Sequence, residues 1–415
     1  MSTTSLANLI DGGRLWARHM ALAKFGARED DGVDRPALSS VESEARAQLV
    51  SWAREIGLVP FTDRIANLFL RYEGRNPSLP PVLAGSHIDS QPTGGKFDGV
   101  FGVLAALEAV QAIIAGGEQP LRSIEVVAWT NEEGSRFAPG MSGSEVFTGR
   151  KTLDDVLAIR DQAGFSLGAA VSQVLSRDVD IPVRAFGFPV AAFVEPHIEQ
   201  GPLLEAAGTQ IGVVTGIQGT RRYRVRVNGE AAHAGTALRA ERRDALMAAV
   251  RMIAEIDRAA ISPDDIKLTV GLFQVTPNAP SVVPAEVLFS IDLRHPDNSI
   301  VDEMDRKIRH LVEAECGPCT VEVTQIAHAP SLAFSTKIRS LIASAASSEK
   351  IPSMDIYSAA GHDARQLHYV CPTGMIFIPC RGGISHNPYE WAEPQHIVAG
   401  AKVLANVVWQ LANIS

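Results

Sequence analysis

Apolar and polar positions repeat along the chain with two periods, and the order of these periods predicts the fold. Residues 41–58 repeat apolar side chains with helical spacing, whereas 66–74 and 81–89 are short apolar runs typical of strands. A long apolar segment at 99–117 indicates a buried helix, and 123–133 indicates an apolar strand that ends in polar residues. Strands that alternate with helices in this way predict an α/β fold with a mixed, mostly parallel sheet.

The pattern changes between residues 216 and 328, where a strand, a helix, two strands, a helix and a strand follow one another. This βαββαβ order is typical of a compact ferredoxin-like unit. A helical pattern at 331–348 and a buried strand at 372–379 then resume the first arrangement. We therefore expect one discontinuous domain, residues 1–215 and 329–415, with residues 216–328 inserted into it as a second domain.

Chain length, net charge and the sequence of the N-terminal segment limit the classes of protein to which this chain can belong. The chain has 415 residues, which favours two domains, and its net charge of −9 lacks the basic patch that nucleic-acid binders carry. The arginine-rich stretch 221–227 alternates with apolar residues and is better explained as a strand with one solvated face. The first twenty residues do not follow the signal-peptide pattern, and no uncharged run of about 18 apolar residues occurs. We expect a cytoplasmic protein with neither a nucleic-acid nor a membrane partner.

The motif CGPC, from Cys316 to Cys319, raises the possibility of a thioredoxin-like redox site. Such a motif opens a helix after a strand. Here it follows a helical pattern at 299–315 and precedes a strand, so a turn that ends the helix is the favoured interpretation.

Histidines and carboxylates gather where the predicted strands of the first domain end. They are His87, Asp98, the pair Glu132 and Glu133, His197 and His386. Ligands of such sheets bind outside the carboxyl ends of the strands, and imidazoles with carboxylates suit Zn²⁺, Mn²⁺ or Co²⁺. One central carboxylate can bridge two ions about 3.5–4 Å apart. A histidine at a strand end is often only structural, so the pattern alone leaves both a metal site and a structural role open.

The adjacent glutamates have different predicted roles, because neighbouring side chains at the end of a strand point in different directions. One can bind a metal ion while the other faces the reacting water as a general base.

Seven motifs in this order carry a resemblance to a known family: GSHIDSQPTGGKFDGVFGVLAALE, NEEGSRF, HIEQGPLLE, HAGT, IDLRH, GHDA and GGISHNP. The chain resembles the metal-dependent amidohydrolases of the hydantoinase/carbamoylase group over nearly its whole length. That group includes N-carbamoyl-L-amino acid hydrolases, allantoate amidohydrolases and bacterial β-ureidopropionases, within a larger clan of dizinc aminoacylases and peptidases.

The resemblance implies two divalent metal ions per subunit. His87, Asp98 and His197 would hold one, and Asp98, Glu133 and His386 the other, so that Asp98 bridges them. Asp89 would orient His87, and Glu132 would be the general base.

The resemblance also implies a set of substrate contacts. Gln200, Arg294 and the backbone at Gly361 would bind the substrate, and His233 would stabilise the oxyanion. Without the resemblance, a surface ion pair at a sheet edge is the favoured interpretation of Arg294, and Gln200 could be a loop residue bonded to the backbone. The chain departs from the family pattern at Ser281, where an asparagine is usual, and at residues 238–239, where it has Leu-Arg.

The expected reaction is hydrolysis of the C–N bond of a ureido or amide group on an amino-acid-like carboxylate. A deacylase or dipeptidase of the same clan and a non-catalytic metal-stabilised binding protein are the alternatives. In the resembling family the inserted domain serves as a lid and dimerises, so a homodimer is expected, with His233 reaching into the partner's site.

Overall fold

The computed structural model describes residues 6–261 and 266–414. Of the first twenty residues, which do not follow the signal-peptide pattern, residues 1–5 lie outside the described residues. Contacts divide the chain into two compact units, Met1–Thr215 with Phe334–Ser415, and Gly216–Ala333. The sequence placed the corresponding boundaries at 215/216 and 328/329. Among the described residues, none of the helices is both long enough and apolar enough to cross a membrane.

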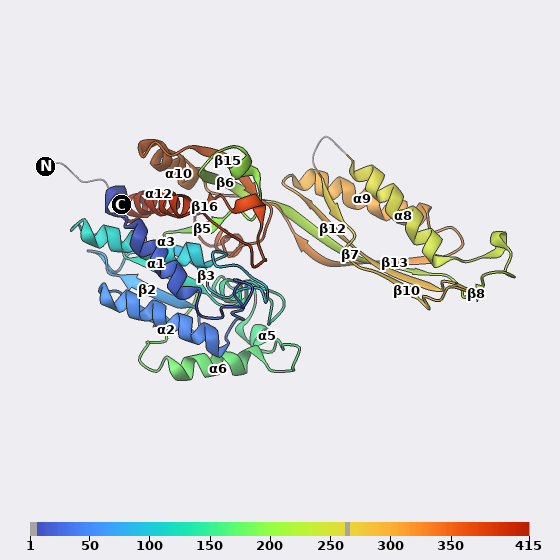
Figure 1. Cartoon of the computed structure of the whole chain (residues 1–415), viewed down its shortest axis with the longest axis horizontal. Coiled ribbons are helices and arrows are strands. Elements are labelled where there is room, and N and C mark those ends of the chain that lie inside the picture. The colour runs from blue at the N-terminus through green and yellow to red at the C-terminus, as the bar shows by residue number, and fades with distance from the viewer. Residues whose placement is uncertain (1–5, 262–265, 415) are drawn as a thin grey trace. The chain divides into compact units, whose positions relative to one another are not determined.

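A large mixed sheet organises the first unit (Figure 1). Its strands are β1 Val59–Thr62, β2 Leu68–Tyr72, β3 Val82–His87, β4 Ile124–Trp129, β5 Ala192–Ile198, β6 Ile211–Ile217, β14 Leu332–Ala333, β15 Ser353–Ser358 and β16 Thr373–Ile378. By contacts, β14 and the last two residues of β6 belong to the second unit. The order is β1-β2-β4-β3-β5-β16-β6-β14, and β15 also pairs with β6. The central strands β4, β3, β5 and β16 run parallel, while the flanking pairs are antiparallel. The predicted mixed α/β sheet is confirmed.

The parallel strands lie in the interior of the unit, because every residue of β3, β4, β5 and β16 is buried. Near-continuous burial is typical of parallel strands that helices cover on both faces. Two helices, α3 Val100–Ala115 and α12 Pro394–Ala412, pack against each other and against β3, β5 and β16. The side chains between them form the main apolar core.

The remaining helices of this unit complete its covering. They are η1 Leu6–Leu9, α1 Gly12–Leu22, α2 Ser40–Glu55, α4 Ser142–Phe147, α5 Leu153–Leu157, α6 Leu167–Arg177, α7 Leu203–Ala206, α10 Thr336–Ser348, α11 Ala364–Leu367 and η3 Arg381–Gly383. The helix expected over 331–348 begins only at Thr336, because Leu332–Ala333 pairs with β6 as a strand.

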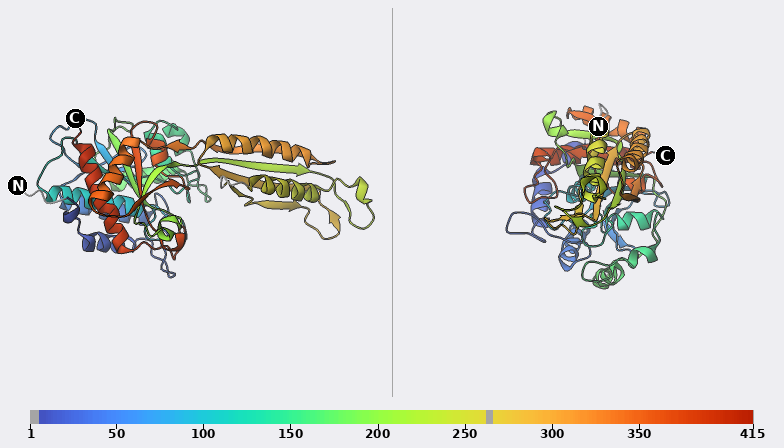
Figure 2. Two further views of the ribbon diagram at one scale, coloured as in Figure 1. Left: turned by 90° about the horizontal axis from the view of Figure 1, so that it is seen from above. Right: turned by 90° about the vertical axis from the view of Figure 1, so that its right-hand side faces the viewer.

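The second unit is an antiparallel sheet with two helices on one face (Figure 2). Its elements are β7 Gly219–Asn228, β8 Ala232–His233, η2 Arg239–Glu241, α8 Ala245–Ala260, β9 Lys267–Thr269, β10 Phe273–Thr276, β11 Val282–Val283, β12 Glu286–His295, α9 Asn298–Ala314 and β13 Thr320–Ala329. The sheet order is β10-β12-β7-β13, and β9 also pairs with β12. The first of the two consecutive strands that the sequence pattern indicates in this unit, residues 266–275, is divided into β9 and β10, which both pair with β12.

Alternation along β7 explains its arginine-rich sequence. Tyr223, Val225 and Val227 are buried with the side chains of α8 and α9, while the intervening arginines lie on the opposite face. The CGPC motif forms a turn after α9, in which the Cys319 amide donates to the Cys316 carbonyl at 3.1 Å.

Candidate functional site

Four loops with predicted ligands begin at the same edge of the large sheet. His87 ends β3, the Glu132–Glu133 pair follows β4, and His197 is the penultimate residue of β5. His386 follows β16 after a short 3-10 turn, and Asp98 lies just before α3. Because β4, β3, β5 and β16 are parallel, their carboxyl ends meet at one edge, where ligands of such sheets bind.

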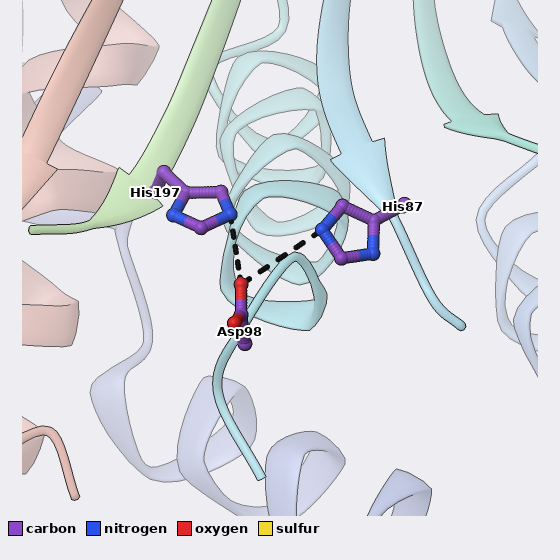
Figure 3. A group of neighbouring side chains, drawn as sticks. All are labelled: His87, Asp98 and His197. Carbon is purple, nitrogen blue, oxygen red and sulfur yellow. Dashed lines mark ion pairs between the residues drawn. The ribbon is translucent and has the colours of Figure 1, made fainter. Parts of the chain in front are cut away.

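Two imidazoles converge on one oxygen of Asp98 (Figure 3). His197 Nε2 lies 3.0 Å and His87 Nε2 lies 3.8 Å from Asp98 Oδ1. All three side chains are buried, each at most 6% exposed. Two buried imidazoles and a carboxylate so close together are a group that could hold a metal ion.

Backbone carbonyls fix the orientation of both imidazoles. His197 Nδ1 lies 2.9 Å from the Ile198 carbonyl, and His87 Nδ1 lies 3.0 Å from the Asp89 carbonyl. A carbonyl can only accept, so Nδ1 carries the hydrogen in each neutral ring and the Nε2 lone pair faces Asp98. This is the arrangement that metal-binding histidines require.

The second oxygen of Asp98 faces another ligand group. His386 Nε2 lies 3.2 Å from Asp98 Oδ2 and 3.5 Å from Glu133 Oε2. Gln91 Nε2 donates to the same Glu133 oxygen at 2.8 Å. Within each group, His87–Asp98–His197 and Asp98–Glu133–His386, the ligand atoms lie within 4.8 Å of one another. The structure therefore brings together the five predicted metal ligands, with Asp98 in both groups.

Gly99 leaves the space that the two imidazoles occupy. Its φ is +67°, and a Cβ built there would lie 2.4 Å from the His87 ring. Its amide N–H approaches His197 Nε2 at 3.3 Å. A side chain at this position would displace His87, so the close approach requires glycine.

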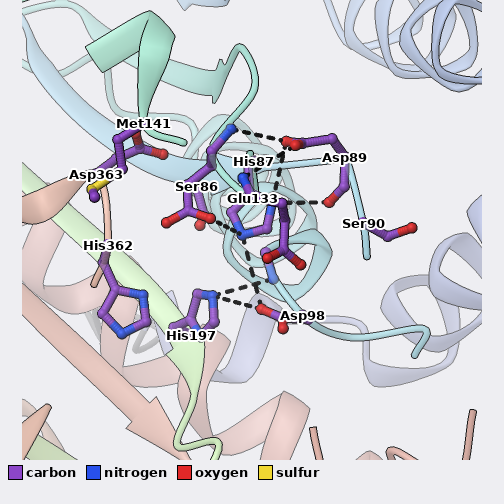
Figure 4. Close-up of polar contacts among 12 residues, drawn as sticks. Ser86, His87, Asp89, Ser90, Asp98, Glu133, Met141, His197, His362 and Asp363 are labelled. Atoms are coloured by element: carbon purple, nitrogen blue, oxygen red, sulfur yellow. Dashed lines mark hydrogen bonds and ion pairs between the residues drawn. The ribbon is translucent and has the colours of Figure 1, made fainter. Parts of the chain in front are cut away.

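Asp89 connects the His87 loop to the glutamate pair (Figure 4). Its two oxygens accept the backbone N–H groups of Glu132 and Glu133 at 3.3 and 3.2 Å. Asp89 Oδ1 also lies 3.5 Å from His87 Nδ1. The carboxylate of Asp89 thus positions one ligand and both glutamates, as expected of a residue that orients His87.

Glu132 is separate from both ligand groups of the described residues, although its Oε2 lies 3.6 Å from His87 Nε2. Burial raises the pKa of Glu132 well above its usual value, against the opposing effect of His87. Nearby acids, Asp363 foremost, raise it further. A carboxylate with a raised pKa beside a ligand group has the properties of a general base.

Hydrogen bonds among these carboxylates and imidazoles shift their pKa values. Burial alone would raise the pKa of Asp98, but hydrogen bonds to His197 and His386 hold it well below its usual value. The hydrogen bond to Asp98 raises the pKa of His386 to about 9. A divalent cation would replace these protons, because ligands bind in their deprotonated forms.

Gln200 and Gly361 lie in the first unit. Gln200 adopts a positive φ of 57° and donates through Nε2 to Asp98 Oδ2 at 2.9 Å. It therefore contacts the central carboxylate of the ligand groups. Gly361 is exposed in the loop between β15 and α11, where a Cβ would be in ordinary contact with Met141 at 3.5 Å.

His233, Ser281 and Arg294 belong to the second unit. His233 is exposed, and its Nδ1 accepts the N–H groups of Gly235 and Thr236 at 3.1 and 3.2 Å. The Ser281 carbonyl accepts the Ala234 N–H at 3.0 Å, so Ser281 lies beside the His233 loop. Arg294 forms a two-pronged contact with Asp292, at 2.8 and 3.1 Å.

Several buried residues around the ligand groups were not identified from the sequence. Glu195 accepts from Ser86 Oγ and from the Ala364 N–H, each at 2.7 Å. Its signal was a charged residue inside an apolar strand, two positions before His197 and therefore on the same side of β5. Glu390 and Asp363 are likewise buried, at 2% and 0% exposed, but lie in loops where acids are common.

The donor set fits a divalent metal. Three imidazole nitrogens and two carboxylates are the ligands that Zn²⁺, Mn²⁺ and Co²⁺ accept. The Nδ1 contacts of His87 and His197 leave Nε2 of each ring for an ion. The residues that would hold the ions are supplied by four separate loops, which the parallel strands fix in place.

Comparison with known proteins identifies the family. The model of peptidase family M20/M25/M40 matches residues 83–410. The chain is 37% identical to N-carbamoyl-L-amino-acid amidohydrolase of Rhizobium meliloti, over 98% of this chain and 97% of that protein. It is 35% identical to allantoate amidohydrolase of Escherichia coli, over 94% and 96%. A hydantoinase/carbamoylase family amidase from Burkholderia multivorans superposes with a TM-score of 0.90 at 42% identity, over 97% of this chain and 98% of that one. The chain belongs to peptidase family M20/M25/M40 and, within it, to the hydantoinase/carbamoylase group.

Proposed function

We propose that this chain is an amidohydrolase that binds two divalent ions per subunit and hydrolyses the C–N bond of a ureido or carbamoyl group. The substrate carries a carboxylate, and for an N-carbamoyl amino acid the products are the amino acid, CO₂ and ammonia. The names of the relatives, N-carbamoyl-L-amino-acid amidohydrolase and allantoate amidohydrolase, support this substrate class.

The observation that carries the proposal is the position of Asp98 between two ligand groups. Its Oδ1 faces His87 and His197, and its Oδ2 faces His386. A carboxylate that offers one oxygen to each group is the feature that distinguishes a two-ion site from a single site.

The residues around the ions have separate tasks in the proposed reaction. Bound ions would activate a water molecule and polarise the scissile carbonyl. Glu132, which lies outside both ligand groups, accepts the proton of the attacking water and returns it to the leaving nitrogen. Asp89 holds the backbone of Glu132 in place for both transfers.

His233 is proposed to donate a hydrogen bond to the oxyanion. Because its Nδ1 accepts two backbone N–H groups, the neutral ring carries its hydrogen on Nε2. The exposed Nε2–H is then a donor of the kind that stabilises developing negative charge. Gln200 beside Asp98, Gly361 in the loop between β15 and α11, and Ser281 and Arg294 in the second unit are proposed to bind the substrate.

Ammonia release tests the reaction. The substrates are N-carbamoyl-L-amino acids, allantoate and ureido acids, each with Mn²⁺, Zn²⁺ or Co²⁺. N-acetyl amino acids and dipeptides are the controls, and because they release no ammonia their turnover is followed by the free amino acid formed. Turnover of ureido substrates alone supports the proposal, whereas turnover confined to acetyl or dipeptide substrates contradicts it. Chelation with full ion removal should abolish the rate, and full activity of ion-free protein would refute the metal-dependent reaction.

A homodimer through the second unit is the proposed assembly. One edge of its sheet is formed by β9 and β10, and edge strands commonly pair with a partner. Apolar side chains beside this edge are exposed, namely Met247, Val250 and Phe273 at 48, 45 and 42%. A cavity of about 420 Å³ lies among them, lined by Val250, Ile253, Ala254, Asp257, Leu268 and Val270. Such a surface suits a second copy of the same unit.

Mixing two inactive variants tests whether His233 acts in the partner's site. A heterodimer of His233→Ala with Glu132→Ala has one complete site if His233 acts in trans. With random subunit exchange about half of the dimers are mixed, so roughly a quarter of all sites should be active. Absence of recovered activity, with exchange shown independently by mass spectrometry, would remove His233 from the trans role.

A further inference from the structure

Glu390 is a buried carboxylate that none of the predicted roles includes. It lies between η3 and α12, only 2% exposed. Its Oε1 accepts the backbone N–H groups of Phe97 and Asp98 at 2.9 and 3.0 Å. Its Oε2 lies 3.1 Å from the hydroxyl of Ser385. All its hydrogen-bond partners among the described residues therefore lie in two loops.

Those two loops carry metal ligands. The first presents Asp98, whose main chain Glu390 holds directly. The second presents His386, which follows Ser385. The Ser385 hydroxyl also lies 3.1 Å from Asp98 Oδ2, so its single hydrogen connects the carboxylates of Glu390 and Asp98. Glu390 thus links the shared carboxylate to the histidine of the second ligand group.

The backbone opposite Glu390 is shaped to receive it. A Cβ built on Gly95 would lie 2.3 Å from both Cβ and Oε1 of Glu390. Gly95 does not have a positive φ, so the close approach of this side chain is what excludes a larger residue. The position of the Glu390 carboxylate is therefore fixed from both sides.

We propose that Glu390 is a positioning residue for the ion bound by Asp98, Glu133 and His386. The inference rests on the proposed two-ion site. Two of the three ligands of that ion depend on Glu390, whereas only Asp98 does so in the group with His87 and His197. Removing Glu390 should therefore weaken the second ion more than the first, and loss of such an orienting partner typically costs about 10–100-fold in metal affinity.

The test measures ion binding to metal-stripped protein in the oligomeric state in which it is isolated. The proteins compared are wild type, Glu390→Ala, Glu390→Gln and Gly95→Ala. Calorimetric titration with chelator competition gives the affinity of each ion, and the visible spectrum of the Co²⁺ protein reports its coordination. We expect the affinity for the second ion, the one bound by Asp98, Glu133 and His386, to fall about 10–100-fold in Glu390→Ala while that for the first ion changes less. Glu390→Gln keeps an oxygen for the two N–H groups and should lose less. Gly95→Ala, which displaces the carboxylate without removing it, should resemble Glu390→Ala.

Glu108→Gln is the matched control, because Glu108 is also fully buried and accepts a distant backbone N–H, that of Asp11, at 2.8 Å. It should lower thermal stability without changing ion affinity or the Co²⁺ spectrum. If Glu390→Ala does not fold, Glu390→Gln and Gly95→Ala decide the question. Wild-type affinity and spectrum in the Glu390 and Gly95 variants would overturn the inference while leaving the two-ion site intact. A wild type that binds a single ion would overturn both.

Discussion

Substitution of the two adjacent glutamates should separate metal binding from proton transfer. Glu132 lies outside both ligand groups, so Glu132→Gln should retain the wild-type ion content. Its amide has the size of the carboxylate but cannot accept the proton. General-base catalysis typically contributes about 10²–10⁴-fold, so kcat should fall by that factor, equivalent to about 3–5 kcal/mol of barrier.

Glu133→Gln should lose activity because it impairs metal binding, which precedes proton transfer. Glu133 is one of three ligands in its group and the only carboxylate that is not shared with the other group. In the wild type, Gln91 Nε2 donates to Glu133 Oε2 at 2.8 Å. If the amide nitrogen of the Glu133→Gln side chain takes the place of that oxygen, two N–H donors face each other and neither has an acceptor there. The expected result is loss of the second ion and partial restoration of activity by excess metal.

Elemental analysis of both proteins, together with steady-state rates over a range of added metal, measures the two effects. Added metal should raise the rate of Glu133→Gln and leave that of Glu132→Gln unchanged. Ion loss in Glu132→Gln with full ion content in Glu133→Gln would show that the two roles are reversed. Wild-type rates in Glu132→Gln would remove the general base from the reaction.

Two further substitutions test the substrate site and the core. Ser281→Asn should change the kcat/KM ranking across a panel of ureido acids. The asparagine side chain is longer than that of serine, and its amide offers both a donor and an acceptor to the substrate. An unchanged ranking would exclude Ser281 from substrate contact. His19→Phe should reduce acid sensitivity. Burial lowers the pKa of His19 to about 3, from 6.5 in the unfolded chain, so the unfolded state takes up a proton first and stability is lost as pH falls through this interval. Chemical denaturation should show that wild type loses about 2 kcal/mol more than the variant between pH 7 and pH 5, and equal losses would contradict this reasoning.

The fold could be predicted because its signals are local. Continuous apolar runs at β3, β4 and β16 and the apolar segment at α3 indicated buried parallel strands with a covering helix. Errors arose where pairing partners decide the structure. Leu332–Ala333 has the composition of the helix that follows it, but it forms a strand because β6 offers it an open edge.

The proximity of the candidate ligands could be predicted because parallel strands bring their carboxyl ends together, whatever the distance along the chain. His87 and His386 are far apart in sequence, yet each follows a strand of the parallel set, and their motifs match a family pattern. The tautomers of the histidines could not be predicted, since the carbonyls of Asp89 and Ile198 that set them depend on the local path of the chain.

Residues that position the ligands escape sequence reasoning for a physical reason. A ligand must be a histidine or an acid at a strand end, and this restricts the candidates. A residue that holds a ligand loop need only reach two backbone N–H groups, as Glu390 does at Phe97 and Asp98, nearly three hundred positions away along the chain. Such contacts follow from the folded path of the loops and leave no spacing rule in the sequence. The absence of a side chain at Gly95 is the one trace that Glu390 leaves in another segment, and its meaning becomes evident only when the two loops are seen in contact.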